Sequence, residues 1–116
     1  MNTKFRAWDE KYNCWDKCPI ICYPNEDFNK QGRTIQWSTG LTDINNNPIY
    51  QGDIVKYIPS DFASIRVGTI IFCNYFNGWA AKDATNYSVY NLNVPFMGLN
   101  RIEVIGNIFE NPELLK

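Results

Sequence analysis

The chain has 116 residues, with 11 basic and 12 acidic side chains and no histidine, and this length suits one domain spanning residues 1–116. The formal net charge of −1 argues against a global field that attracts nucleic acid or anionic lipid, and 16% aromatic residues argue against a disordered chain. No apolar run approaches a membrane span and no signal-peptide pattern opens the sequence, so we expect no membrane association and a cytoplasmic location.

The N-terminal segment has the alternation of a strand with one buried face. Between Thr3 and Trp8, the side chains of Lys4, Arg6 and Trp8 alternate with those of Phe5 and Ala7. A charged turn follows, and Cys14-Trp15 is predicted to pair back as a hairpin. The segment 20–23 is a candidate short strand, and residues 24–27 have turn composition.

The centre of the chain is predicted to be a hairpin. Residues 34–38 alternate, with Ile35 and Trp37 on one face, and an Asn-rich turn then leads to Ile49-Tyr50. A second turn at Gly52-Asp53 starts another strand, because Gly allows unusual backbone angles and Asp accepts hydrogen bonds from turn amides. The residues expected to fix these turns are Gly40, Asp43, Asn46, Gly52 and Asp53.

The second half continues the strand pattern. Residues 54–58 carry apolar atoms on both faces, and 64–73 form the longest β-rich run, in which Gly68 is expected to mark a bulge or bend at a barrel corner. Asn77-Gly78 is a two-residue hairpin signal that would place Tyr75-Phe76 across from Trp79-Ala80.

The C-terminal third predicts two more strands and a short helical turn. The strands are residues 87–94 and 102–109, with Gly106 as a second expected kink, and Asn111-Pro112 has the form of a helix start. About seven or eight short strands predict a mainly β fold, a small curved antiparallel sheet that closes into a barrel or sandwich. The stretch Gly52–Phe72 is similar to the strand pair of SH3-like barrels.

Three blocks of sequence resemble a known family. They are Lys4 to Asp9, the stretch from Ser38 to Tyr57 with its Thr-Gly-Leu, Ile-Tyr and Gly-Asp-Ile-Val motifs, and Glu103 to Leu115. In this order they resemble the YopX family of phage and prophage proteins. That family tends to have Asn-Gly in the central turn where this chain has Asn45-Asn46, and Asn tolerates a positive φ, so we expect the turn to survive. The resemblance implies a phage origin.

The residue types argue against catalysis. Without histidine, the usual general base and the commonest metal ligand are both missing, and no Gly-x-Ser-x-Gly or phosphate-binding loop is present. Asp43, Asp53 and Glu103 are a conceivable carboxylate set, but the first two stand where turns favour Asp. We therefore predict a protein without enzymatic activity and without a cofactor.

The four cysteines admit two interpretations. Cys14, Cys18 and Cys22 are spaced four apart and Cys73 is distant. An all-cysteine zinc site would need three ligands from one short segment that contains Pro19. The favoured interpretation is that they are small, partly buried apolar side chains, which leaves no predicted metal site.

The aromatic content points to binding. A small barrel buries only part of 4 Trp, 7 Tyr and 7 Phe, and exposed rings mark subunit, partner or base-stacking surfaces. Several rings stand opposite the apparent core face. We predict a ligand or partner surface that contains Trp8, Tyr57, Arg66, Trp79 and Tyr90.

Two functions remain open. The first is a non-enzymatic phage accessory protein that binds a host protein or a small nucleotide-like ligand as a homo-oligomer; a counter-defence or regulatory role is implied by the family's setting. The alternative is a nucleic-acid-binding β-barrel in which Tyr57 and Trp79 stack on bases. Its phosphate-binding residues would be Lys4, Arg6, Lys56, Arg66 and Lys82, although acidic residues are interleaved with them.

Overall fold

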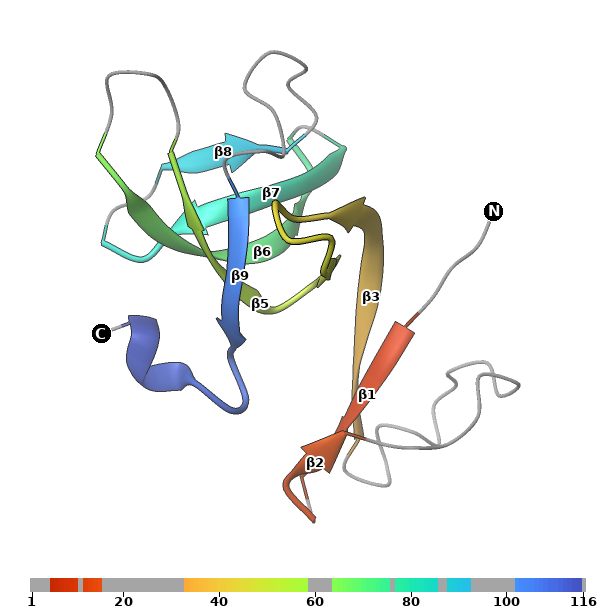
Figure 1. Cartoon of the computed structure of the whole chain (residues 1–116). Coiled ribbons are helices and arrows are strands. Elements are labelled where there is room, and N and C mark those ends of the chain that lie inside the picture. Colours follow the sequence, from red (N-terminus) through yellow and green to blue (C-terminus); the bar gives the residue numbers. More distant parts are fainter. Residues whose placement is uncertain are drawn as a thin grey trace.

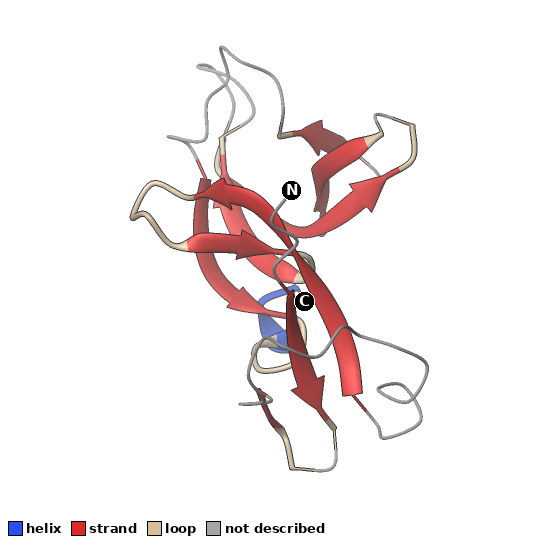
Figure 2. Cartoon of the chain, turned by 90° about the vertical axis from the view of Figure 1, so that its right-hand side faces the viewer, coloured by secondary structure: helices blue, strands red, loops and turns tan. Residues whose placement is uncertain are grey.

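The structure is a computed structural model, and it describes residues 5–10, 12–15, 33–58, 64–75, 77–85, 88–92 and 102–115. Strands dominate this part of the chain, which ends in a short 3-10 helix, Pro112–Leu115 (Figure 2). The strands are β1 (Phe5–Asp9), β2 (Cys14–Trp15), β3 (Arg33–Thr42), β4 (Pro48–Tyr50), β5 (Asp53–Tyr57), β6 (Arg66–Cys73), β7 (Gly78–Asp83), β8 (Val89–Asn91) and β9 (Ile102–Asn107). Within these ranges, no helix is long and apolar enough to cross a membrane.

The strands form two antiparallel sheets. One has the order β2-β1-β3-β4, and the other, with the order β8-β7-β6-β5-β9, curls into a half-barrel (Figure 1). The predicted mainly β fold with a curved antiparallel sheet is therefore confirmed, as is the short C-terminal helical turn. The predicted Cys14-Trp15 hairpin is present, with Trp8 opposite Trp15.

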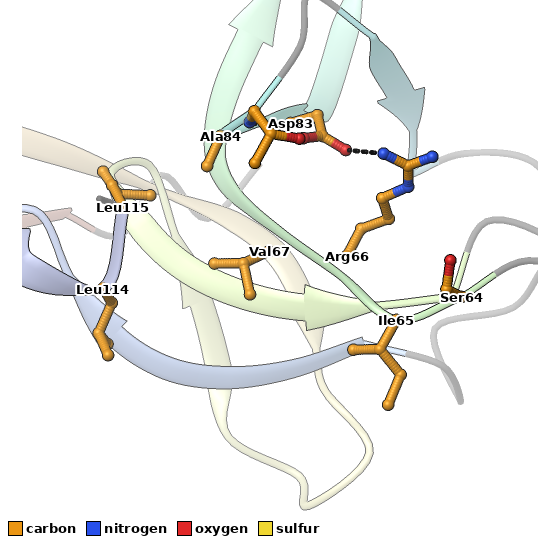
Figure 3. Close-up of a pocket in the computed structure, with 9 residues that line it drawn as sticks. Ser64, Ile65, Arg66, Val67, Asp83, Ala84, Leu114 and Leu115 are labelled. Carbon is orange, nitrogen blue, oxygen red and sulfur yellow. Dashed lines mark hydrogen bonds and ion pairs between the residues drawn. The ribbon is translucent and has the colours of Figure 1, made fainter.

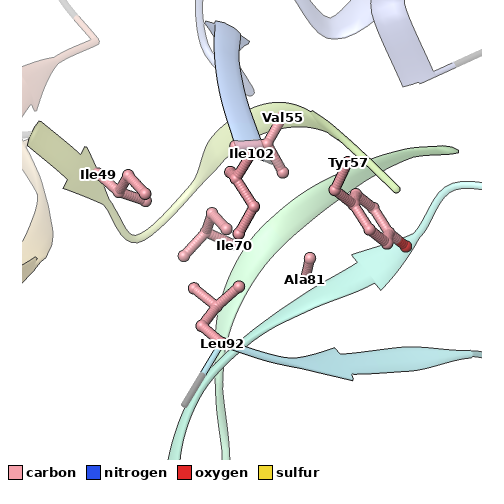
Figure 4. Close-up of a cluster of buried hydrophobic side chains, with 7 residues drawn as sticks. All are labelled: Ile49, Val55, Tyr57, Ile70, Ala81, Leu92 and Ile102. Carbon is pink, nitrogen blue, oxygen red and sulfur yellow. The ribbon is translucent and has the colours of Figure 1, made fainter. Parts of the chain in front are cut away.

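The main hydrophobic core lies inside the curl of the five-stranded sheet (Figure 4). Its buried members come from five strands and from the segment after β8: Ile49, Val55, Tyr57, Ile70, Ala81, Leu92 and Ile102. β-branched and aliphatic side chains pack well on a pleated surface, which explains why the alternating segments of the sequence form these strands.

The predicted turns have the expected backbone conformations. Gly40 (φ 78°), Gly52 (φ 85°) and Asn46 (φ 66°) all lie in the left-handed region, which confirms that Asn46 sustains the turn. A Cβ atom at Gly52 would also overlap the amide group of Gln36, whose side chain would have to shift.

The two glycines predicted to mark kinks behave differently. At Gly106 the prediction is confirmed, because the β5–β9 register shifts from Ile54↔Gly106 to Val55↔Val104 and leaves one additional residue in β9. Of the bulge or bend predicted at Gly68, the bulge is absent, because the strand pairs regularly with both neighbours. Glycine is needed there for close approach: an added Cβ would lie 2.5 Å from the Lys82 carbonyl oxygen.

The Asn77-Gly78 signal marks a hairpin, but the predicted register is wrong. Cys73 pairs with Gly78 and Phe72 with Trp79, so residues 74–77 form a four-residue loop. Asn77 adopts φ 50°, and its amide donates to the Asn74 carbonyl over 3.3 Å. Asn74 and Asn77 together, rather than Asn77-Gly78 alone, therefore close this loop.

Some predicted features fall outside the described residues. They are the candidate strand at 20–23, the turn at 24–27, Lys4, Cys18, Cys22, and the beginning and end of the predicted strand at 87–94.

Candidate functional site

The aromatic residues predicted to form a binding surface lie mostly in the interior. Trp8 is 7% exposed and Tyr57 is 2% exposed, so the expectation that their rings face outward is wrong. Trp79 and Tyr90 are half-buried and pack against the main core. Tyr57 and Tyr90 are adjacent, with ring centroids 5.4 Å apart. The structure therefore brings Tyr57, Trp79 and Tyr90 together as core, and Trp8 lies elsewhere.

Trp8 is buried by residues distant in the sequence. Its ring stacks on Phe109, with centroids 5.2 Å apart and planes 7° apart, and Trp15 meets it edge-on at 5.0 Å. The Trp15 indole N–H donates to Glu110 over 2.6 Å. The alternation in β1 separates its two faces. It does not predict which face is covered by a distant residue such as Phe109.

On the same face of β1, Arg6 and Asp53 form a buried polar cluster. Arg6 forms an ion pair with the Asp53 carboxylate and donates from Nε to Gln36 over 3.0 Å. The rings of Trp15 and Tyr50 lie 4.1 and 4.5 Å from the guanidinium carbon. These contacts join β1, β2, β3 and β4 of one sheet to the first residue of β5 in the other, so the cluster ties the two sheets together.

Asp53 is nearly inaccessible, with 1% of its surface exposed. Burial raises the pKa of its carboxyl group, while the Tyr50 amide, which donates to it over 2.8 Å, and the Arg6 charge oppose that rise. Both carboxylate oxygens are therefore occupied. The predicted turn role of Asp53 is confirmed, and its link to Arg6 is an addition that the sequence pattern did not reveal.

Asp43 organises the β3–β4 turn and caps the edge of β9. Its carboxylate accepts from the amides of Asn45, Asn47 and Val104 over 2.9, 2.8 and 2.8 Å. Burial acts to raise the pKa of Asp43, but these backbone donors outweigh it and the pKa lies below its usual value. Glu103 faces Lys56 at 3.7 Å. The three carboxylates considered as a catalytic set are each engaged separately.

Arg66 lies in a different environment, beside a groove at the start of β6. Its Nη1 lies 3.2 Å from Asp83, whose side chain is 2% exposed, whereas 40% of the Arg66 side chain is exposed. Asp83 also accepts from the Thr85 amide and hydroxyl, each over 2.8 Å. Asp83 also acts on the hydroxyl group of Tyr57. Burial raises the pKa of Tyr57 to about 12, and the Asp83 charge and its hydrogen bond to Tyr57 add to that rise.

The groove beside Arg66 has a volume of about 390 Å³ (Figure 3). We call it the Arg66 groove. Its described lining comes from the start of β6, the end of β7 and the residues after it, and the C-terminal 3-10 helix: Ser64, Ile65, Arg66, Val67, Asp83, Ala84, Thr85, Leu114 and Leu115. Ile65, Val67, Leu114 and Leu115 contribute aliphatic side chains to the lining, whereas the Arg66 guanidinium group is turned toward Asp83 (Figure 3).

The opposite end of β6 presents aromatic rings to solvent. Tyr75 is 91% exposed and Phe72 is 45% exposed, and Phe72 meets Trp79 edge-on with centroids 5.3 Å apart. We call Phe72, Tyr75 and Trp79 the aromatic tip. Among the predicted binding residues only Trp79 belongs to it. The Asn77-Gly78 signal indicated that a hairpin end lies here, but not which rings it would expose.

The basic residues proposed to contact nucleic acid are largely engaged. Arg6, Lys56 and Arg66 form ion pairs with Asp53, Glu103 and Asp83. They are distributed over β1, β5 and β6 rather than along one strand.

The two described cysteines lie in different sheets. Cys14 is exposed in β2, and Cys73 is half-buried at the end of β6. Across the residues that the structure describes, no group of three potential metal ligands occurs. Cys18 and Cys22 lie outside that part of the chain, so the expectation that the cysteines bind no metal stays a prediction.

Comparison with known proteins connects this fold to a family. The chain is 26% identical to the SPbeta prophage-derived uncharacterized protein YopX of Bacillus subtilis (strain 168), over all of this chain and 98% of that protein. The crystal structure of protein EF1440 from Enterococcus faecalis superposes with a TM-score of 0.61 at 25% identity, covering all of this chain and 99% of that one. The YopX protein family profile matches residues 11–116, and the chain therefore belongs to the YopX family of phage and prophage proteins.

Proposed function

We propose that this chain is a non-enzymatic phage accessory protein that acts by binding and that associates with itself through the aromatic tip. The observation that carries the proposal is the exposure of Tyr75 and Phe72 beside Trp79 on one hairpin end. Exposed aromatic rings grouped in this way are typical of interface centres, and identical subunits most often meet through the same patch.

Two features of the acidic residues support binding over catalysis. Asp43 and Asp53 are 5% and 1% exposed, and their oxygens are engaged by backbone amides and by Arg6. A general base must reach the proton that it removes, and these carboxylates are not accessible to a substrate. The absence of histidine from the sequence adds to this argument.

The prophage setting of the family supports a target in the host cell. We propose that the self-associated protein engages a host protein or a small nucleotide-like ligand, with a counter-defence or regulatory outcome. Nucleic-acid binding is the weaker alternative, because three of its proposed phosphate contacts already face carboxylates. Retention on heparin or single-stranded DNA that falls with added salt would favour that alternative.

Analytical ultracentrifugation of wild type, Tyr75→Ser and Tyr12→Ser tests the proposed association. Tyr12, which is 68% exposed on the β1–β2 hairpin, is a matched control away from the tip. We expect wild type to self-associate, Tyr75→Ser to weaken the association about tenfold, and Tyr12→Ser to leave it unchanged. A monomeric wild type, or equal effects of both substitutions, would contradict the proposal.

A further inference from the structure

A pocket of about 200 Å³ lies where the two sheets meet, and we call it the inter-sheet pocket. Its described lining comes from β3, the turn before β5, β6 and the segment after β9, and it includes Ile35, Gln36, Gly52, Ile71, Ile108 and Phe109. Ile70 belongs to the main core, so the side chain of its neighbour Ile71 points to the opposite face of β6. Ile71, Ile108 and Phe109 therefore give the pocket apolar walls.

The edge of β3 brings one backbone donor and one backbone acceptor to this pocket. The Gln51 amide donates to the Trp37 carbonyl over 2.8 Å, on the side of β3 that faces away from β1. Backbone N–H and C=O groups of one strand residue point to the same side, and that side alternates along the strand, so the Ile35 groups point the same way as those of Trp37. On that side the ladder with β4 pairs only Ser38 and Thr42, and no residue that the structure describes pairs with Ile35.

Gln36 adds a buried donor on the same side of β3. The residue is 3% exposed, and its Oε1 accepts from Arg6 of β1 over 3.0 Å, so this oxygen is turned toward β1. Its Nε2 is turned the other way, toward Gly52, where an added Cβ atom would overlap it. Among the described residues, Nε2 has no hydrogen-bond acceptor. A buried donor without a partner is costly, which favours a ligand acceptor at this position.

The polar groups of the pocket define a hydrogen-bonding pattern. The Ile35 N–H, the Ile35 C=O and Nε2 of Gln36 present a donor, an acceptor and a second donor. The complement of this pattern is an N–H group between two carbonyl groups, which is an imide. A residue of an extended peptide supplies one carbonyl and one N–H to such an edge and would leave Gln36 unpaired.

The size of the pocket restricts the occupant to one ring. An engineered cavity of about 150 Å³ holds benzene, and sites for drug-sized ligands span about 300–1,000 Å³. A volume of about 200 Å³ therefore suits a single six-membered ring, whose faces the walls of Ile71 and Phe109 can cover. Ile108, which also lines the pocket, is 37% exposed, so a substituent on the ring can extend past it into solvent.

We infer that the inter-sheet pocket binds a pyrimidine ring with an imide edge, of the uracil or thymine type, as part of a free nucleoside or nucleotide. The two ring carbonyl groups accept from the Ile35 amide and from Nε2 of Gln36, and the ring N–H donates to the Ile35 carbonyl. Proteins read this edge in unpaired bases. The inference rests on the proposed binding of a small nucleotide-like ligand and names the base of that ligand.

NMR titration of the ¹⁵N-labelled full chain tests the inference. The probes are uridine, 3-methyluridine, which lacks the ring N–H, and cytidine, in which an amino group replaces one carbonyl. We expect saturable shifts of the amides around the pocket with uridine, at about millimolar affinity or tighter, and at least about tenfold weaker binding of the other two. An unsaturated response to uridine, or equal binding of either analogue, would overturn the inference. A short oligouridylate that binds at least about tenfold more tightly than uridine would overturn the assignment to a free nucleotide in favour of single-stranded nucleic acid.

Two variants of equal exposure locate the site. Ile108→Ser removes part of the apolar wall, and Leu114→Ser is its matched control, because Leu114 is also 37% exposed but lines the Arg66 groove instead. We expect Ile108→Ser to weaken uridine binding about tenfold and Leu114→Ser to leave it unchanged. Equal affinities of the two variants would overturn the placement in the inter-sheet pocket.

Gln36→Met removes the buried donor at similar side-chain length, and we expect it to weaken uridine binding about tenfold. An unchanged affinity would count against the role of Gln36. If this variant unfolds because Arg6 loses an acceptor, the comparison of uridine with cytidine on wild type still decides whether both carbonyl groups are recognised. Ultracentrifugation of the same samples separates the two proposals, since uridine binding by a monomeric protein would defeat self-association alone. Self-association without uridine binding would defeat this inference alone.

Discussion

Arg6 is the residue whose contacts explain why two distant motifs of the sequence occur together. It stands in the N-terminal block and reaches Asp53 in the Gly-Asp-Ile-Val motif, 47 residues away. Gln36 and the rings of Trp15 and Tyr50 complete its surroundings. Because a buried carboxylate is costly without a partner, the motifs depend on each other for folding. Two of the sequence blocks that resemble the family are therefore joined by an ion pair that links the two sheets.

Asp53→Asn tests that link. The substitution keeps an acceptor for the Tyr50 amide but removes the charge that faces Arg6, so we expect the free energy of unfolding to fall by about 2 kcal/mol. Urea denaturation measures this loss. Glu103→Gln is the control, because the Lys56–Glu103 pair has side chains 49% and 42% exposed and should contribute less than about 0.5 kcal/mol. Equal losses in the two variants would contradict the assigned role of Asp53.

The lowered pKa of Asp43 predicts how the free energy of unfolding changes with pH. Its pKa in the folded state lies below the ordinary 3.8, so the folded form holds its proton less tightly than the unfolded form. The stability that Asp43 contributes is therefore present above that ordinary value and is lost as the pH falls through the lowered pKa.

Asp43→Asn should accordingly reduce the acid sensitivity of the protein. We expect the difference in unfolding free energy between wild type and the variant to be largest at neutral pH and to shrink below about pH 4. Urea midpoints measured at several pH values check this expectation. A difference that is constant over this range would mean that the carboxylate charge does not matter at this turn.

At the scale of the strand, β6 requires a glycine at its third position. Gly68 is buried between two strands, and an added Cβ would lie 2.5 Å from the Lys82 carbonyl oxygen and 3.0 Å from the Tyr57 ring. We expect Gly68→Ala to lower the unfolding free energy by about 1–3 kcal/mol through steric overlap, as measured by chemical denaturation.

Gly40→Ala separates overlap from backbone strain. No atom lies within 4 Å of the Cβ position at Gly40, but its φ is +78°. Strain alone should cost about 1 kcal/mol there. If Gly68→Ala proved less destabilising than Gly40→Ala, close packing would not be the reason for glycine in β6.

Local patterns predicted most strands but not the faces that they bury. Alternation located β1, β3, β5, β6 and β9, and turn chemistry located Gly52 and Asn46. In β3 the alternation placed Ile35 and Trp37 on one face, and the buried side chain, with 3% exposure, is that of Gln36 on the other face. Gln36 is buried because it contacts Arg6 of β1, and a contact between strands is not encoded in the period of either one.

The candidate site was predictable only in part for the same reason. Arg66 was predicted to be a binding residue, but the groove beside it is assembled from β6, the residues at and after the end of β7 and the C-terminal 3-10 helix. Leu114 is distant from Arg66 in the sequence, and no local sequence pattern predicts that both residues line one groove. The aromatic tip depends likewise on the register of one hairpin, which the Asn77-Gly78 signal alone placed incorrectly.

For the molecule as a whole, the two ends of the described chain meet. Trp8 and Trp15 of the first hairpin enclose Phe109, which follows the last strand. The Glu110 carboxylate accepts hydrogen bonds from the side chains of Trp15 and Asn107 over 2.6 and 3.0 Å. The N-terminal hairpin is therefore anchored by the C-terminal segment as well as by its own sheet.

Phe109→Ala should loosen this anchor selectively. We expect amide hydrogen exchange to accelerate in β1 and β2, with little change in β5, β6 and β7, whose core does not include Phe109. The emission of Trp8 should also shift to longer wavelength as water reaches its ring. Uniform acceleration across both sheets would instead indicate that the molecule opens as one cooperative unit.

The turn around Asp43 has a consequence for behaviour at high concentration. Along the outer margin of β9, the Val104 amide is taken by Asp43 and the Ile102 carbonyl by the Ile44 amide over 3.0 Å. An extended chain from a neighbouring molecule would find these backbone groups occupied. Polymerisation by strand addition, the route to amyloid in many small β proteins, is thus hindered at these two positions of the margin.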